Sequence, residues 1–238
     1  MAQHVQGQEQ ASAAKNAGFF ADNRNYARFV GSLETYRQVR RVIDREIAGV
    51  HRMLDVGNGG VFDYDTRLAE QIVGVDLFLH DTSPSPASNI TLRRGDALAL
   101  QEPTAAYDAV LECSVFHHLV GPNVESTLAN VRRAVRETHR VLAPGGRLIV
   151  VESCVSALAF AFERHLFGPL RLLARTPLMR HPATLQFPSE TIAEIIRERF
   201  GNVTSAPIPV GALMLQFGVP WPTILTPARM HLFTATRS

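Results

Sequence analysis

The sequence predicts an α/β protein in which helices cover both sides of a largely parallel sheet. Short apolar runs alternate with segments of helical spacing, and glycine, proline and acidic residues separate the two kinds of segment. The chain has 238 residues, 46% of them hydrophobic and 19% charged, which is enough to bury a sizeable core.

Residues 19–49 have the apolar spacing of helices, and Gly49 is a suitable stop. The next segments alternate. Five strands are expected, within 51–57, 71–77, 90–96, 107–113 and 146–153. Helices are expected between several of them, notably at 65–71 and 123–142. Pro84 and Pro86 argue against a full helix in the connection between the second and third strands.

The last third of the chain departs from this alternation. Residues 156–181 have an apolar, helical pattern that is interrupted at Gly168-Pro169. A helix is expected over 187–201, with Ser189 or Thr191 as its cap and Gly201 as its end. Two strands are expected, at 205–218 and 228–237, with a proline-rich loop at 219–227 between them.

We therefore expect one domain over residues 1–238. Its parts are a disordered tail at 1–16, an N-terminal helical cap at 17–50, a core at 51–153, a helical lid insertion at 154–187, and a C-terminal helix with the last two strands at 188–238.

Charge and cysteine content limit the choice of partner and compartment. The formal net charge is +2, and the scattered arginines form no stripe for nucleic acid. The N-terminus lacks the apolar segment of a signal peptide, and no apolar run approaches the ~18 residues of a membrane span. Cys113 and Cys154 match no metal or disulfide spacing, so we expect a cytoplasmic protein without a metal site.

The stretch MLDVGNGGVFDYD, residues 53–65, predicts a cofactor loop. Its glycines resemble those of a dinucleotide-binding loop, but Phe62 stands where the third glycine of that motif belongs. Asp63 and Asp65 would repel a pyrophosphate at the start of a following helix. These residues therefore argue against binding of a dinucleotide cofactor at this loop.

Three acids are expected at successive strand ends along one edge of the sheet, where open α/β sheets bind ligands. Asp55 is placed to attract a cationic group, Asp76 to bind the hydroxyls of a ribose, and Asp96 to accept from the amine of an adenine. A ribose, an adenine and a positively charged amino-acid tail together describe S-adenosylmethionine.

The chain resembles the class I S-adenosylmethionine-dependent methyltransferases, in the small-molecule branch that includes ubiquinone and menaquinone methyltransferases. The motifs that carry the resemblance are LDVGNGG, VGVDL, GDALAL, YDAVLECSVFHHL and ETHRVLAPGGRLIVVES, in order over residues 52–153. The sequence departs from the family at Asn58 and at Gly60-Val61, which puts the path of the loop in question.

The resemblance implies a Rossmann-like seven-stranded sheet in the order 3-2-1-4-5-7-6, with strand 7 antiparallel. It also implies which residues contact the cofactor: Asp55, Gly57, Asn58, Gly59, Asp76, Leu77, Asp96, Ala97, Glu112 and Cys113. Glu112 and Cys113 would do so through backbone or side chain.

His117 and Glu152 are the candidate catalytic residues. His117 follows the fourth strand and is a candidate general base, while packing at the start of a helix is the structural alternative. Glu152, at the tip of the fifth strand, would orient substrate or cap the lid.

The lid region leaves two interpretations open. Its apolar residues suggest an apolar pocket for the acceptor, and Met214, Phe217 and Trp221 would contribute further apolar side chains to that pocket. Its arginines, Arg164, Arg171 and Arg175, fit either peripheral contact with a membrane or the solvated outer face of a packed lid.

The predicted function is methyl transfer by in-line displacement to a small, partly apolar acceptor, of a specialised-metabolite or quinone-like kind. Two alternatives stay open. One is a non-catalytic regulatory module that keeps the cofactor fold, and the other is a macromolecule methyltransferase. The sequence leaves open which acceptor atom is methylated and how many copies assemble.

Overall fold

The structure is a computed structural model that describes residues 34–79, 87–174, 176, 183–209, 212–214, 220–222 and 228–238. Several predictions fall outside these residues: the tail at 1–16, the N-terminal helical segment before residue 34, and the effect of Pro84 and Pro86.

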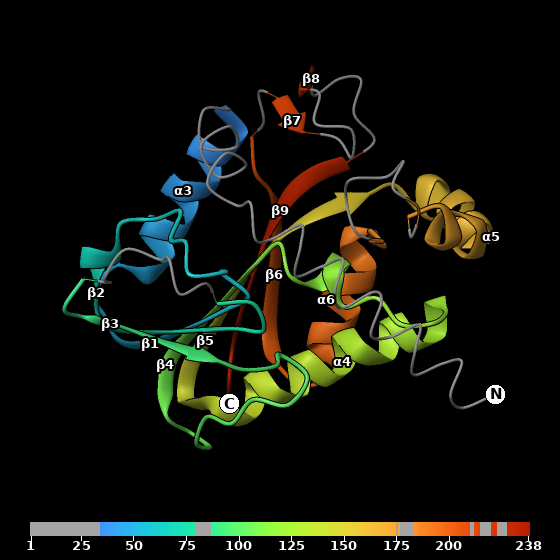
Figure 1. Cartoon of the computed structure of the whole chain (residues 1–238). Coiled ribbons are helices and arrows are strands. Elements are labelled where there is room, and N and C mark those ends of the chain that lie inside the picture. Colours follow the sequence, from blue (N-terminus) through green and yellow to red (C-terminus); the bar gives the residue numbers. More distant parts are fainter. Residues whose placement is uncertain are drawn as a thin grey trace.

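A seven-stranded sheet forms the centre of the molecule (Figure 1). Its strands are β1 (Val50–Val56), β2 (Ala69–Asp76), β3 (Ile90–Arg94), β4 (Tyr107–Cys113), β5 (Leu142–Val155), β6 (Gly201–Pro207) and β9 (Ala228–Thr236). The order is β3-β2-β1-β4-β5-β9-β6, and β9 alone runs antiparallel to its neighbours. This confirms the predicted sheet order and its antiparallel strand.

Helices cover both faces of the sheet (Figure 1). Helix α3 (Glu34–Ile47) packs on one face, and α4 (Val124–Val141) with α6 (Ser189–Arg197) packs on the other. Alternate residues of each central strand serve the two layers, so that Met53 lies on the α3 side and Leu54 on the α4 side. The middle parts of the central strands are therefore largely apolar, as in sheets buried on both faces.

Local sequence accounts for the ends of α4. Asn123 caps the helix by accepting from the backbone N–H of Ser126 at 2.8 Å, and the Ser126 hydroxyl lies 3.0 Å from the N–H of Asn123. This reciprocal capping box fixes the start of the helix predicted at 123–142.

Helix α5 (Ala157–Ala174) is continuous, so the predicted interruption at Gly168-Pro169 is wrong. A proline lacks the N–H that bonds to the carbonyl four residues earlier. Pro169 lies on the exposed side of α5, where water can satisfy that carbonyl in its place.

The helix predicted at 65–71 is also wrong. A single 3-10 turn, Thr66–Leu68, is found there, and β2 begins at Ala69 opposite Val50 of β1. Asp65 caps this turn by accepting from the N–H of Arg67 at 3.1 Å. The first crossover of the sheet is thus a loop, and no helix N-terminus follows the glycines.

The C-terminal boundaries also differ from the prediction. Helix α6 ends at Arg197 and has Pro188 at its N-cap position, without a side-chain cap. The strand expected at 205–218 is divided: β6 starts earlier, at Gly201, and Ala212–Met214 forms β7. In the predicted loop, Pro220–Pro222 forms β8, which pairs with β7 in a separate two-stranded sheet.

Within the described part of the chain, none of the helices has the length and apolar character needed to cross a membrane.

Candidate functional site

The predicted acids lie together at the carboxyl edge of the sheet. Asp55 is the penultimate residue of β1, Asp76 is the last residue of β2, and Asp96 follows β3 by two residues. Strand β2 pairs with β1 on one side and β3 on the other, so the three strand ends are adjacent. This is the edge at which open α/β sheets bind ligands.

The glycine loop after β1 turns at Gly59 and Gly60. Their φ angles are 59° and 80°, and the carbonyl of Asn58 accepts from the N–H of Val61 at 2.9 Å. Two successive positive φ angles are typical of a type I′ turn. The side-chain oxygen of Asn58 also accepts from the N–H of Gly60 at 2.7 Å. Glycine is therefore needed one position before Val61, which explains the departure from the family motif.

Two further glycines let the loop pack closely. Gly57 has a φ of 81°, and a Cβ atom on it would lie 2.6 Å from a methyl group of Val115. A Cβ atom on Gly74 of β2 would lie 2.7 Å from the amide nitrogen of Asn58. The backbone of the loop thus lies directly against β2 and the segment after β4.

Asp55 is a buried acid whose charge is not balanced by a described cation. It is 2% exposed, and the hydroxyl of Tyr64 donates to its carboxylate at 2.6 Å. Burial raises the pKa of Asp55 to about 6, against the hydrogen bonds of Tyr64 and Asn58, and the nearby charges of Asp76 and Asp63 raise it further. No ion pair of the described residues includes Asp55. A cationic ligand group would favour the ionised form.

Asp76 joins the glycine loop to the end of β2. Its carboxylate accepts from the N–H of Gly59 at 2.8 Å and from the N–H of Phe78 at 2.7 Å. Its backbone carbonyl accepts from Gly95 at 3.0 Å, which brings the segment containing Asp96 alongside. The carboxylate is partly exposed and keeps acceptor capacity for a ligand.

The other predicted contact residues differ in how they face this edge. Leu77 is 45% exposed next to Asp76, and Ala97 is partly buried after β3. Glu112 is buried, and its carboxylate is hydrogen-bonded to the hydroxyl of Thr138 in α4, so only its backbone is available at the edge. Cys113, the next residue, is partly exposed and lies on the opposite side of the sheet.

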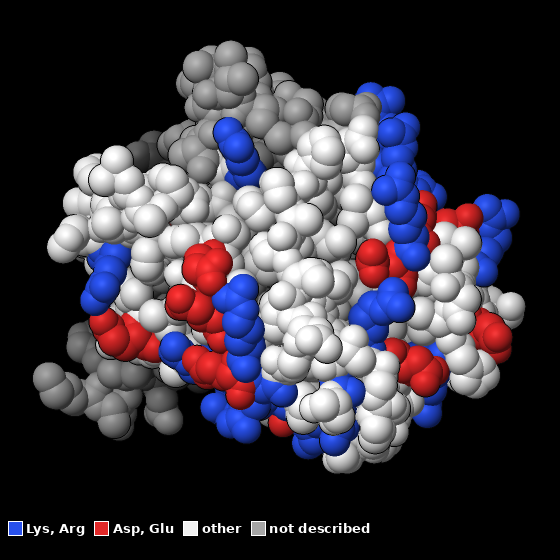
Figure 2. All heavy atoms as spheres, turned by 180° about the vertical axis from the view of Figure 1, so that it is seen from behind, with Lys and Arg blue, Asp and Glu red and all other residues white. Residues whose placement is uncertain are grey.

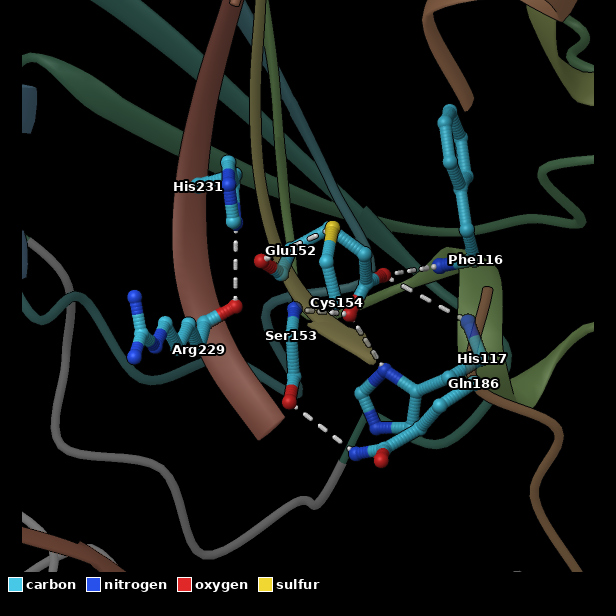
Figure 3. Close-up of polar contacts among 8 residues, drawn as sticks. All are labelled: Phe116, His117, Glu152, Ser153, Cys154, Gln186, Arg229 and His231. Carbon is cyan, nitrogen blue, oxygen red and sulfur yellow. Dashed lines mark hydrogen bonds and ion pairs between the residues drawn. The ribbon is translucent and has the colours of Figure 1, made fainter. Parts of the chain in front are cut away.

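The side chains of His117 and Glu152 form a dyad beside this edge (Figure 3). His117 lies in a 3-10 turn, Phe116–His118, after β4, and Glu152 lies in β5. The Nδ1 atom of His117 is 2.6 Å from a carboxylate oxygen of Glu152. The same carboxylate accepts from the backbone N–H of Phe116 and of Ser153, each at 2.8 Å.

These contacts orient the imidazole ring of His117. A carboxylate only accepts hydrogen bonds, so we assign the proton to Nδ1 and leave Nε2 as an acceptor. Glu152 is 1% exposed at its side chain and His117 is 12% exposed, so the dyad is held inside the protein with limited access to solvent.

The lid brings a second carboxylate to His117. Burial raises the pKa of Glu163 in α5 to about 7, and a hydrogen bond from the backbone of Gln186 and the charge of His117 oppose that rise. The carbonyl of His117 accepts from Leu185 at 3.1 Å, and the amide of Gln186 donates to the Ser153 hydroxyl at 3.0 Å (Figure 3). The lid is thus hydrogen-bonded to both sides of the dyad.

The sequence analysis did not single out Tyr64 and Glu163. Tyr64 stands between two acids in FDYD, nine residues after Asp55. Glu163 is the only acidic residue in the apolar segment 154–187, and a lone acid in such a segment is a signal that points to a partner.

Known proteins match the part of the chain that contains this edge of the sheet. Residues 54–150 match a family model described as a methyltransferase domain. This part of the chain is therefore similar to a methyltransferase domain, and the match covers less than half of the chain. A curated relative of this chain, the demethylmenaquinone methyltransferase of Thermus thermophilus, is 32% identical over 125 residues. That match covers 48% of this chain and spans about half (52%) of the relative's length.

Solved structures of other proteins share the fold of this chain. A possible histamine N-methyltransferase of Thermotoga maritima is 17% identical, with a TM-score of 0.58 over 92% of this chain and 98% of that one. The N-methyltransferase NodS of Bradyrhizobium japonicum WM9, in complex with S-adenosylhomocysteine, is 15% identical, with a TM-score of 0.52 over 85% of this chain and 87% of that one.

The residues of the edge fit S-adenosylmethionine. Asp55 offers a buried carboxylate without a described counter-ion. Asp55 would hold the positively charged end, Asp76 the ribose, and Asp96 with Ala97 the adenine. The described residues contain no group of three or more side chains placed to hold a metal ion.

Proposed function

We propose that this protein transfers the methyl group of S-adenosylmethionine to a small, partly apolar metabolite, of a quinone-like or specialised kind. The observation that carries the proposal is the His117–Glu152 dyad, which lies next to the cofactor edge and below an apolar lid. Gly57 packs against Val115, two residues before His117, so the glycine loop and the dyad lie close together.

The chain's residues supply a proton acceptor and an enclosed site. When bound, S-adenosylmethionine supplies an already activated methyl group. Nε2 of His117 would accept the proton that an acceptor's O–H or N–H group loses when it is methylated. Glu152 stabilises the imidazolium that forms, and Glu163 adds a second negative charge in its ionised form.

Two kinds of observation support a partly apolar acceptor. The relative from Thermus thermophilus is named for demethylmenaquinone, an apolar quinone. In this chain, Phe160 and Phe167 of α5 pack towards the dyad side of the lid, and Phe160 lies against Phe187 with ring centroids 5.9 Å apart. We also propose a reducing, cytoplasmic compartment, which the free thiols of Cys113 and Cys154 support.

The test is turnover with a panel of acceptors. Reduced quinones, phenols and amines are incubated with the protein and S-adenosylmethionine, and S-adenosylhomocysteine is measured. We expect His117→Ala to lower kcat by about 10²-fold or more while cofactor affinity stays within about twofold, as for loss of a general base. Cofactor binding without turnover on any acceptor would favour the regulatory alternative.

The chain offers a matched control. His51 and Glu70 form a second His–Glu pair with the same 2.6 Å separation, but on the exposed, opposite end of the sheet. His51→Ala should leave kcat unchanged. An equal effect of the two substitutions, or none from His117→Ala, would remove the dyad from the mechanism.

A further inference from the structure

The outer face of α5 is apolar and uncovered, unlike that of an ordinary surface helix. It exposes six large hydrophobic side chains, of which Leu158 is 82% exposed and Phe162 68%; the set is Leu158, Phe162, Leu166, Leu170, Leu172 and Leu173. The helices of soluble proteins normally turn polar residues outward. Apolar patches of this kind mark places where another molecule binds.

The charges of α5 are all basic on the outside. Glu163, the single acid of the helix, points inward to Gln186 and His117. Arg164 has a side chain 59% exposed and lies 3.7 Å from the carboxylate of Glu125, and the partly exposed Arg171, two turns along the same side, donates to the carbonyl of Gly121. Seen from behind, the left part of the surface in Figure 2, where α5 lies, is an almost uncharged area with both basic and acidic groups at its border.

We propose that this outer face of α5 docks on the surface of a lipid bilayer that contains anionic lipids. An apolar face with flanking arginines matches a helix that lies in the interface, with its apolar side chains at the level of the acyl chains and the guanidinium groups near the phosphates. A second copy docked face to face would bring like charges at the borders of the two helices together, which disfavours that occupant.

The position of α5 relates membrane docking to the supply of the acceptor, and this part of the inference rests on the proposed function. A cavity of about 580 Å³ opens beside α5, lined by Phe160, Ala161, Arg164 and His165. Its four lining residues all belong to α5, which also carries Glu163 near His117. Docking of α5 would therefore bring the bilayer close to the helix that lies beside the dyad.

The test is co-sedimentation of the full chain with vesicles of phosphatidylcholine, with and without about one quarter phosphatidylglycerol. We expect about tenfold or stronger binding to the anionic vesicles. The double variant Leu158→Glu, Phe162→Glu should bind about a hundredfold more weakly, while Leu158→Met, Phe162→Leu, which keeps the face apolar, should bind as the parent does.

A second pair of double variants tests how much the arginine charges contribute to binding. Arg164→Gln with Arg171→Gln should weaken binding to the anionic vesicles about tenfold or more, at about 1 kcal/mol per arginine near the surface. Arg133→Gln with Arg136→Gln removes the same charge from the exposed side of α4 and should have little effect.

The proposal is overturned if the parent binds neither vesicle, or if the glutamate variant binds as well as the parent. It is also overturned if light scattering without lipid shows a dimer that Leu158→Glu, Phe162→Glu dissociates, because a second copy is then the occupant. Vesicle binding does not need turnover, so failure of the proposed methyl transfer leaves this test intact. With a short-chain, water-soluble acceptor the glutamate variant should turn over normally, and only an acceptor presented in vesicles should be methylated more slowly.

Discussion

Replacing Asp55 by asparagine should stabilise the fold and weaken binding of S-adenosylmethionine at the same time. Burial raises the pKa of this carboxyl from 3.8 to about 6. The folded state then binds more protons than the unfolded state between about pH 4 and pH 6, so stability falls as the pH rises through that range. Above it, a shift of about two pKa units corresponds to about 3 kcal/mol of lost stability.

The amide removes this loss because it does not ionise. Asparagine keeps an oxygen that can accept from Tyr64, but it buries an extra N–H₂ group at a cost that does not depend on pH. The change in the variant's stability gain between two pH values therefore reports the ionisation of the Asp55 carboxylate alone. The gain in unfolding free energy of Asp55→Asn over the parent should grow by about 2 kcal/mol between about pH 4.5 and pH 8.

Urea unfolding at the two pH values measures this gain, and titration calorimetry measures the cofactor. At about pH 8 we expect Asp55→Asn to bind S-adenosylmethionine about ten- to a hundredfold more weakly, because the cationic end loses its carboxylate. The parent's affinity should fall below about pH 6, where Asp55 becomes protonated, and the variant's should not. A stability gain that is the same at both pH values would refute the reasoning.

Three other substitutions test the same edge of the sheet. Burial raises the pKa of Glu112 to about 7, so stability contributed by its neutral form is lost as the pH rises through that value; Glu112→Gln should raise the unfolding free energy by about 2 kcal/mol more at about pH 8 than at about pH 5. Gly74→Ala places a Cβ atom 2.7 Å from Asn58 and should cost about 1–3 kcal/mol in thermal or urea unfolding and weaken the cofactor, whereas Gly201→Ala meets nothing within 4 Å and should cost little. Asp76→Ala should lower calorimetric affinity for S-adenosylmethionine about tenfold or more, and an unchanged affinity would exclude it from the cofactor site.

The sheet could be predicted because its signal is local. The central strands contain apolar runs whose residues turn alternately to two buried faces, and Asp55, Asp76 and Asp96 lie at or just after the ends of their strands. Knowing that parallel strands end at one edge was then enough to gather Asp55, Asp76 and Asp96. The prediction of a helix at 65–71 failed because tertiary pairing limits the segment. Thr66–Leu68 form one 3-10 turn, and from Ala69 onward the chain already pairs with β1 as part of β2.

The sequence by itself determined the α/β class and the position of three acids near successive strand ends, because apolar runs and the residues that follow them are close together in the chain; the strand order came from the family resemblance. Only the tertiary structure decided which side chains meet across the chain. Glu152 reaches His117 over 35 residues, Tyr64 closes over Asp55, and Glu163 turns inward while Leu158 and Phe162 are left outside. Such contacts depend on how strands are registered and how α5 is rotated on the core, and no spacing of residues along the sequence fixes either of these.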